Sequence, residues 1–208
     1  MQIVSWNCRG LGNPIKAEAV KDLMRMDPPN ILLLQETKIE EESLLLLSKC
    51  KWKLNTGKVV SARGTSGGLS TLWCEEKFQL KSCYVTQHWI FTEFFHISNK
   101  ISFTLFNCYV PFNFNENKDC WKSILDFLES FSPSNTIIVG DLNITLAPNE
   151  KKGGARGKDP LQDMVEALIQ ANDLFDFKPK RDDSLGLTTE LGLLTSLLIL
   201  AGSSSKVP

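Results

Sequence analysis

Short runs of apolar residues along the chain predict strands that are buried on both faces. They occur at 3–6, 31–34 and 137–139, and each is followed by polar residues. Apolar residues at helical spacing predict helices between Asn13-Pro14 and Asp27, over 40–50, around 121–131 and after Asp159-Pro160. Between 52 and 110 the pattern instead predicts antiparallel strands and hairpins. The alternation of strands and helices favours an α/β fold.

Polar side chains stand where the predicted buried strands end. Asn7 and Glu36 follow the first two strands, and Asp141 and Asn143 follow a third, while Tyr109 ends a further strand at 106–111. Ligand sites of layered α/β folds form at strand ends. Asp141 and Asn143 share one face of an extended chain, because alternate residues do. Carboxylates held there suit a hard cation such as Mg²⁺.

Composition narrows the class of protein. The chain has 208 residues and a net charge of −1, so we expect one domain with at most a short appendage, and binding of a polyanion only at a local site. No apolar run is long enough to cross a bilayer, so we expect no membrane partner. Six irregularly spaced cysteines and the absence of a signal peptide favour an intracellular protein, nuclear or cytoplasmic. Two glycine-rich stretches, Gly64–Gly68 and Gly153–Gly157, lack the sequence pattern of a phosphate loop, so no nucleotide cofactor is expected.

Five motifs occur in an order that carries a family resemblance: Ser5–Leu11, Leu33–Lys38, Gly67–Trp73, Asn107–Pro111 and Ile138–Asn143. Together they resemble the endonuclease/exonuclease/phosphatase superfamily. The chain is most similar there to the endonuclease domain of plant LINE-type (non-LTR) retrotransposons, which in turn resembles apurinic/apyrimidinic endonucleases. The resemblance covers about residues 1–183, and we take this range as the domain.

The resemblance implies a fold and a reaction. The fold is a four-layer α/β/β/α sandwich of two mixed sheets with outer helices. The reaction is hydrolysis of a phosphodiester, as in a DNA-nicking endonuclease, with Mg²⁺ or Mn²⁺. Glu36 would bind the metal with help from Asn7, and Tyr109 would contact the phosphate or the leaving group. Asp141 would orient or deprotonate the attacking water, and Asn143 would position it.

DNA is the implied partner, through local contacts to phosphates. The candidate contacts are basic residues near the predicted strand ends: Arg9, Lys38, Lys151, Lys152 and Arg156. As single residues, each is equally well interpreted as an ordinary solvated side chain.

Two later motifs of the family, which supply an Asp and an Asp-His pair, are absent. No Asp or His follows Asp183, and we assign neither His88 nor His96 to the catalytic position. We therefore expect the last strands of the second sheet to be missing or replaced. Because removal of one member of a catalytic unit costs orders of magnitude in rate, a nuclease of this sequence is expected to be weak or inactive.

Residues 184–208 form a tail of different composition, with only Glu190 and Lys206 charged between Leu185 and Pro208. One interpretation is an amphipathic helix followed by a Ser-rich end. The other is that the tail is foreign to the fold, through a frameshift or a mis-joined exon near Ser184 that leaves the domain truncated.

Two other functions stay open. The first is a non-catalytic remnant that folds and binds metal or nucleic acid. The second is a phosphatase or phosphodiesterase of the same fold that acts on a lipid or an inositol phosphate.

Overall fold

The structure is a computed structural model, and it describes residues 1–26, 28–52, 54, 56–64, 67–133, 135–144, 159–172, 174–177 and 196–200. Its strands form two sheets. The first has the order β1-β2-β4-β3, with β1 Ile3–Asn7, β2 Ile31–Gln35, β4 Leu69–Trp73 and β3 Thr56–Val60. The second has the order β5-β6-β7-β8-β10-β9, with β5 Phe78–Val85, β6 Trp89–His96, β7 Ile101–Tyr109, β8 Thr136–Asp141, β10 Ser196–Leu200 and β9 Leu174–Phe177.

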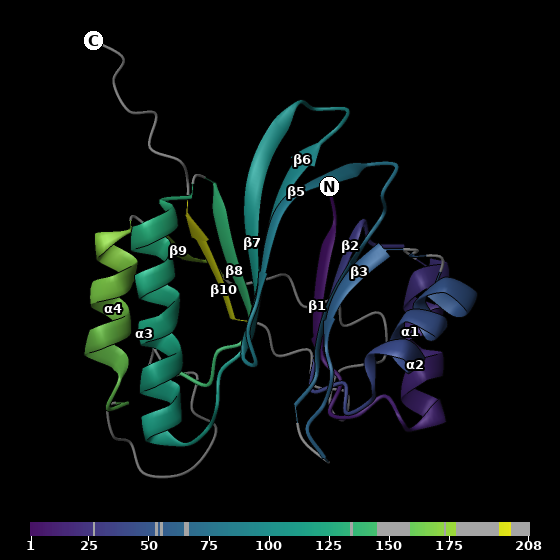
Figure 1. The fold of residues 1–208 in the computed structure, drawn as a ribbon, viewed down its shortest axis with the longest axis horizontal. Helices are drawn as coiled ribbons and strands as arrows, with labels where there is room; N and C mark the ends of the chain where they lie inside the picture. The colour runs from purple at the N-terminus through teal and green to yellow at the C-terminus, as the bar shows by residue number, and fades with distance from the viewer. Residues whose placement is uncertain are drawn as a thin grey trace.

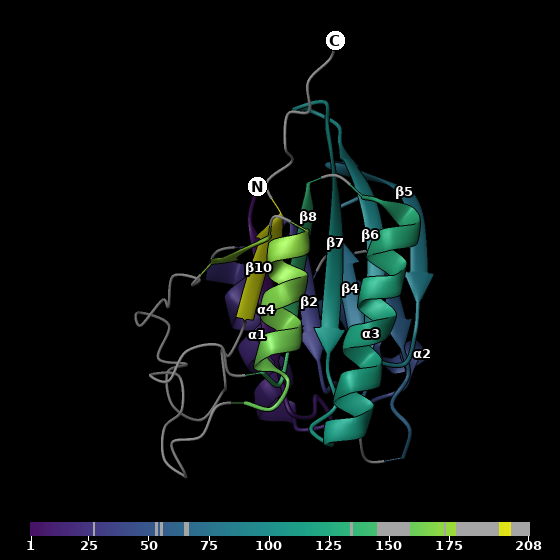
Figure 2. The ribbon, with the colours of Figure 1, turned by 90° about the vertical axis from the view of Figure 1, so that its left-hand side faces the viewer.

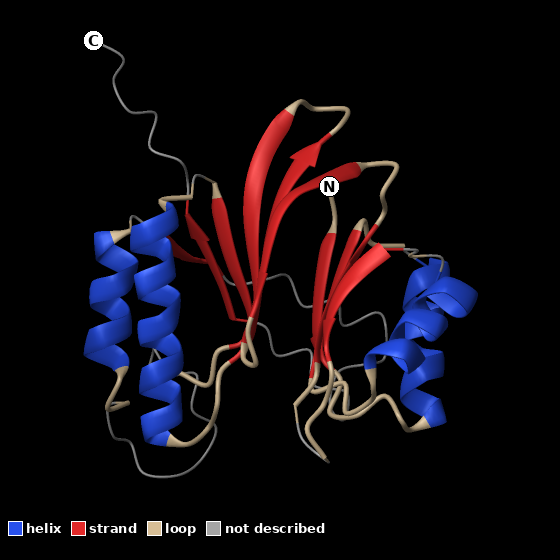
Figure 3. Ribbon diagram, viewed as in Figure 1, coloured by secondary structure: helices blue, strands red, loops and turns tan. Residues whose placement is uncertain are grey.

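Both sheets are mixed. In the first sheet β1 runs parallel to β2, and in the second β7 runs parallel to β8, while the other pairs are antiparallel. Figure 1 shows the sheets face to face, with helices on the two outer sides. The helices are α1 Pro14–Met26, α2 Glu41–Leu47, α3 Phe114–Phe131 and α4 Gln162–Ala171, and a π-helical turn at Ser48–Trp52 follows α2. The predicted four-layer sandwich of two mixed sheets is confirmed (Figure 3).

The two longest helices begin at asparagine caps. The backbone N–H of Ile15 donates to Asn13 Oδ1 at 2.9 Å, and Pro14 occupies the first position of α1, as the sequence predicted. At α3, Asn113 Oδ1 accepts from Asn115 and Glu116. The apolar face of α3 packs with α4 on the six-stranded sheet, where the two helices lie side by side (Figure 2).

Apolar residues fill the space between the sheets. The fully buried side chains there include Ile31 and Leu33 of β2, Phe94 of β6 and Leu105 of β7. Neighbouring residues of the same strands, such as Leu32 and Leu34, face α1 and α2 instead. The strands are therefore buried on both faces, which explains why they read as continuous apolar runs.

The tail contributes a strand. β10 pairs antiparallel with β8 on one side and with β9 on the other. The interpretation of the tail as an amphipathic helix is therefore wrong for Ser196–Leu200, which form a strand. That the last strands of the family are missing or replaced stays a prediction. Leucine and isoleucine are compatible with a helix or a strand. The segment forms a strand because the edge of β8 offers unpaired backbone hydrogen-bonding groups. The domain boundary at 183 and the frameshift remain predictions, since 178–195 lie outside the described residues.

The helices of the described part of the chain include none that is both long enough and apolar enough to cross a bilayer. All six cysteines are free, and Cys8, Cys108 and Cys120 are buried.

Candidate active site

Four predicted site residues meet at one edge of the sandwich, and they come from both sheets. Asn7 ends β1 and Glu36 follows β2, in the four-stranded sheet. Tyr109 ends β7 and Asp141 ends β8, in register with each other in the six-stranded sheet. The structure therefore brings these four predicted side chains together at one edge of the sandwich.

The Asn7 side chain joins the two carboxylates. Its Nδ2 donates to Glu36 Oε1 at 2.8 Å and to Asp141 Oδ2 at 2.7 Å. Its Oδ1 accepts from the backbone N–H of Arg9 at 3.1 Å, which sets the orientation of the amide. Asn7 is 3% exposed, so this group is rigidly held between the sheets. It brings together two acidic side chains that are 105 residues apart in sequence.

Glu36 lies on a strained backbone. Its φ is 51°, in the left-handed region that non-glycine residues rarely adopt, and Lys38 follows with a φ of 55°. The chain turns after the end of β2, where Thr37 and Lys38 donate their backbone N–H groups to the carbonyls of Gly68 and Gly67. Lys38 Nζ lies 3.5 Å from Glu36 Oε2. Seven described non-glycine residues have a positive φ, and four of them are predicted site residues: Arg9, Glu36, Lys38 and Asn143. Strain of this kind concentrates at functional sites.

Gly140, the residue before Asp141, allows a close approach of two strands that positions Asp141. At Gly140 the φ is 138°, and a Cβ there would lie 2.0 Å from the carbonyl oxygen of Cys108, so no side chain fits. The close approach of β7 and β8 brings Asp141 beside Tyr109. Burial raises the pKa of Asp141 above its ordinary value, and the hydrogen bond from Asn7 opposes this rise. A carboxylate with a raised pKa accepts a proton more readily near neutral pH.

Tyr109 stays protonated over the whole physiological range. Burial, together with the negative charges of Glu36 and Asp141, raises the pKa of its phenol to about 12. A hydrogen bond to Glu36 adds to this rise. The phenol is therefore a hydrogen-bond donor in the site and not an anion.

Asn143 is held through both its backbone and its side chain. Its Nδ2 donates to the carbonyl of Val110 at 2.6 Å, and its backbone N–H donates to Asp141 Oδ1 at 3.4 Å. Asn117 of α3, 4% exposed, donates through Nδ2 to the Asn143 carbonyl at 3.0 Å. Asn117 is not among the residues predicted from the sequence. It could have been found as a polar residue among the apolar positions of an amphipathic helix.

The donor set suits a hard divalent cation. The carboxylates of Glu36 and Asp141 supply oxygen ligands, and each keeps acceptor capacity beyond the hydrogen bonds described here. Mg²⁺ is typically bound through one or two carboxylates with several waters. Within the described ranges, no group of three or more His, Cys, Asp or Glu side chains could enclose a metal ion. The site thus fits a metal that keeps part of its water shell, and does not fit a closed cage.

Basic residues flank the site on the first sheet. Arg9 is exposed next to Asn7, and Lys16 Nζ donates to the Arg9 carbonyl at 2.8 Å. Lys38 is the second predicted basic contact at this edge. The other three predicted contacts, Lys151, Lys152 and Arg156, lie outside the described residues.

Neither histidine contributes to the carboxylate pair. His96 packs edge-to-face against Phe78, with ring centroids 4.9 Å apart, and its Nδ1 accepts from the backbone N–H of Asn99. His88 lies in a turn, and its carbonyl accepts from the backbone N–H of Tyr109 at 2.8 Å. Burial lowers the pKa of His88. His88 is thus a neighbour of Tyr109 that the sequence did not indicate.

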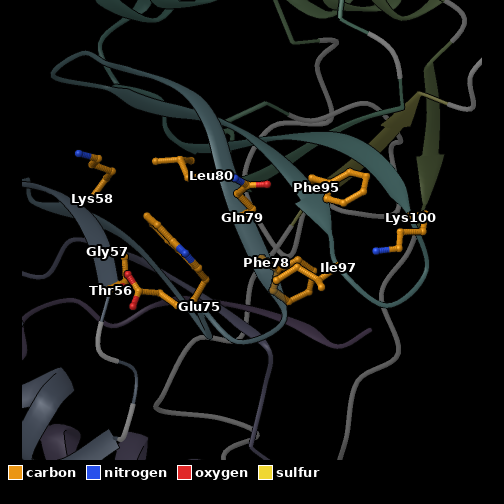
Figure 4. A pocket seen from close by; sticks show the side chains of 11 residues that line it. Thr56, Gly57, Lys58, Glu75, Phe78, Gln79, Leu80, Phe95, Ile97 and Lys100 are labelled. Carbon is orange, nitrogen blue, oxygen red and sulfur yellow. The ribbon is translucent and has the colours of Figure 1, made fainter.

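A groove of about 720 Å³ lies away from the carboxylates (Figure 4). It lies between β3 and β5, among the aromatic rings of Trp73, Phe78 and Phe95, with Lys58 and Lys100 at its sides. Trp73 pairs with Ile31, the residue of β2 farthest from Glu36. The groove therefore belongs to the opposite end of the sandwich and is not part of the candidate site.

Fold and site together define an α/β/β/α sandwich with a pair of carboxylates at its strand ends. The sequence matches the Endonuclease/Exonuclease/phosphatase family over residues 4–188. The chain belongs to this family, and the resemblance found in the motifs is confirmed.

Solved structures share the fold. A 3'-5' exonuclease (NExo) from Neisseria meningitidis superimposes with a TM-score of 0.64 and 16% identity, over 96% of this chain and 86% of the exonuclease. The AP endonuclease LMAP from Leishmania major gives a TM-score of 0.68 at 15% identity, over 95% and 78%. The endonuclease domain of TRAS1, a telomere-specific non-LTR retrotransposon, gives 0.65 at 11%, over 96% and 84%. A comparison with curated protein sequences found no match.

Proposed function

We propose that this chain is a divalent-metal-dependent phosphodiesterase that nicks DNA, with low activity. The observation that carries the proposal is the convergence of Glu36 and Asp141 on the amide of Asn7, at the strand ends of a sandwich of this family. Support for a nucleic-acid substrate comes from structural neighbours, since NExo of Neisseria is described as bound to a product DNA hairpin and LMAP as an AP endonuclease.

Each side chain has a role that follows from its surroundings. Glu36 would hold Mg²⁺ or Mn²⁺, and Asn7 keeps Glu36 and Asp141 together. A cation held there would neutralise charge that develops on the phosphate oxygens. Asp141 orients the attacking water and accepts its proton, a task that its raised pKa favours. Tyr109 donates a hydrogen bond from its neutral phenol to the phosphate or the leaving oxygen.

Asn143 completes this side of the site. Its strained backbone and the bonds to Val110 and Asn117 hold it beside Asp141, where it positions the water and the phosphate. Arg9 and Lys38 contact neighbouring DNA phosphates. Groups that are oriented before the reaction stabilise the transition state without reorganisation, which is why rigidity matters here.

The test is conversion of supercoiled plasmid to open circle in Mg²⁺ and in Mn²⁺. The wild-type protein is expected to nick slowly, and Glu36→Gln and Asp141→Asn are each expected to reduce the rate by about 100-fold or more. Glu75→Gln, at the far groove, is the matched control and should leave the rate unchanged. Nicking that persists in both site variants would contradict the proposal.

The same assay separates the second candidate, a non-catalytic remnant. The absence of a third acidic or histidine ligand among the described residues favours it. For a remnant, Mg²⁺ would raise the melting temperature of the wild type but not of Glu36→Gln, and no nicking would occur. Hydrolysis of an inositol phosphate or a phospholipid, with no action on plasmid, would indicate instead a phosphatase of the same fold.

A further inference from the structure

A pair of buried amide side chains crosses the space between the two sheets. Gln35 is the last residue of β2, and Asn107 lies in β7. Gln35 Nε2 donates to Asn107 Oδ1 at 2.6 Å, and both side chains are fully buried. This bond links the four-stranded sheet directly to the six-stranded sheet.

Each amide is also tied to its surroundings in the first sheet. Gln35 Nε2 donates to Ser5 Oγ of β1 at 3.0 Å. Asn107 Nδ2 donates to the carbonyl of Ser70 in β4 at 2.8 Å. The bridge therefore connects β7 with three neighbouring strands of the opposite sheet, and neither amide can rotate without losing a second bond.

The bridge lies next to the candidate site. Gln35 directly precedes Glu36 and pairs in register with Asn7. Asn107 lies two residues before Tyr109 and on the same face of β7, because alternate residues of a strand share a face. Farther from the site, the residues of β2 and β7 that face the space between the sheets are apolar, with Leu33 and Leu105. The inter-sheet bond therefore lies between the site and the apolar core.

Stability alone does not account for these amides. Gln35 Oε1 is buried and finds no hydrogen-bond partner in the described part of the chain, which carries a desolvation penalty. Apolar side chains of similar size would fill the same space without it. Unlike apolar contacts, buried hydrogen bonds are directional, so they set a defined separation between the groups that make them.

We infer that Gln35 and Asn107 are positioning residues, whose bond sets the distance between the Glu36 side and the Tyr109–Asp141 side of the site. The inference rests on the proposed function. In the proposed site Glu36 of one sheet would hold the metal and Asp141 of the other would orient the water, so the arrangement depends on the separation of the sheets. Asn7 sets that separation within the site, and the Gln35–Asn107 bond sets it immediately beside the site.

The test is the double variant Gln35→Leu/Asn107→Leu, which replaces both amides by apolar groups and leaves neither partner of the pair alone. Loss of groups that support metal ligands typically weakens metal binding by about 10- to 100-fold. We expect Mn²⁺ affinity, measured by titration calorimetry, to fall by about 10-fold or more.

The matched control is Thr104→Val/Thr136→Val. These two hydroxyls form another buried polar pair, 2.7 Å apart, between β7 and β8, at the start of β8 and away from the site. We expect a similar change in melting temperature in both double variants but weaker Mn²⁺ binding only in the first. Wild-type Mn²⁺ affinity in Gln35→Leu/Asn107→Leu would overturn the inference.

A second readout does not depend on metal. The chain has two tyrosines, so ring-labelled tyrosine gives one NMR signal from Tyr109 and one from the exposed Tyr84. Loss of the bridge is expected to shift or broaden the Tyr109 signal and to leave that of Tyr84 unchanged. If wild type binds no Mn²⁺, the proposed function fails, and the Tyr109 signal alone decides the inference: an unchanged signal overturns it. If the double variant does not fold, Gln35→Met replaces it in both measurements.

Discussion

The two ends of the sandwich hold the sheets together by different means. At the far end, away from the carboxylates, aromatic rings of both sheets pack together. The ring centroid of Phe94 lies 5.1 Å from that of Trp73, 5.9 Å from that of Phe78 and 5.7 Å from that of Phe103. At the site end, the contacts between sheets are hydrogen bonds of amide side chains, Asn7 to Asp141 and Gln35 to Asn107. Aromatic packing contributes stability, whereas directional bonds set positions. The difference indicates that the far end maintains the fold and the site end maintains a geometry.

The largest expected effect is a loss of stability on removal of an aromatic ring at the far end. Phe94→Ala removes a fully buried ring from the inter-sheet core and is expected to lower the free energy of unfolding by about 3–5 kcal/mol. Urea denaturation measures this loss. Phe112→Ala is the control, since Phe112 is 91% exposed and its removal should change stability by less than about 0.5 kcal/mol. Mn²⁺ affinity of folded Phe94→Ala should equal that of wild type, and a parallel loss of metal binding would refute the division between the ends.

The opposite pattern is expected for Asn7. Asn7→Ala leaves Glu36 and Asp141 facing each other without the amide that joins them, so Mn²⁺ binding should weaken by about 10- to 100-fold. Calorimetry on the folded variant measures this change. The control is Asn30→Ala, which removes an asparagine side chain beside the far end of β2, where Oδ1 accepts from the backbone N–H of Gln2. Equal losses of metal affinity in both variants would contradict a special role for Asn7.

Much of this geometry was accessible from sequence, and part of it was not. The strand ends at Asn7, Glu36, Tyr109 and Asp141 follow from apolar runs that stop at polar residues. Asn13 and Pro14 likewise predict the start of α1. The roles of the amides were hidden, because Gln35 reads as a polar residue that simply ends a strand, and its partner is 72 residues away in the other sheet.

Two other features depend on tertiary structure. The positive φ of Glu36 has no local signal, since a glutamate does not prefer that conformation. Its turn is held by tertiary backbone hydrogen bonds, with Gly10 and Leu11 on one side and Gly67 and Gly68 on the other. The strand at Ser196–Leu200 was missed because its conformation comes from the edges of β8 and β9. Periodicity within a short apolar run does not distinguish a helix from a strand.

A smaller effect concerns DNA and again compares the two ends. Arg9→Gln/Lys38→Gln removes two positive charges at the site, and Lys58→Gln/Lys100→Gln removes two at the far groove. Only the first is expected to weaken DNA binding, by several-fold, and to lower the slope of log affinity against log salt by about one for each lost phosphate contact. Fluorescence anisotropy with a labelled duplex in Ca²⁺ measures both. Equal weakening by the two variants would place the DNA contacts outside the candidate site.

The smallest expected effect has the opposite sign, a gain in stability. Burial raises the pKa of Asp141, so the folded protein holds this proton more tightly than the unfolded chain does. The contribution of Asp141 to stability is therefore present below its unfolded pKa and is lost as pH rises through the folded value. At neutral pH the buried, ionised carboxylate of Asp141 therefore lowers the stability of the fold. Such a cost is expected where the carboxylate binds a metal or takes part in a reaction, and is not expected for a residue with only a structural role.

Asp141→Asn removes that penalty while its side-chain oxygen still accepts from Asn7. Its melting temperature at pH 7 without metal should exceed that of wild type by a few degrees at most, and the difference should shrink as the pH falls through the pKa of Asp141. Asp22→Asn, in an exposed pair with Arg25, should show no such difference. A lower melting temperature for Asp141→Asn would mean that the charge of Asp141, which strengthens its hydrogen bonds from Asn7 and Asn143, outweighs the cost of burying it. In that case the site end would stabilise the fold as the aromatic end does, and the contrast between the two would lose its basis.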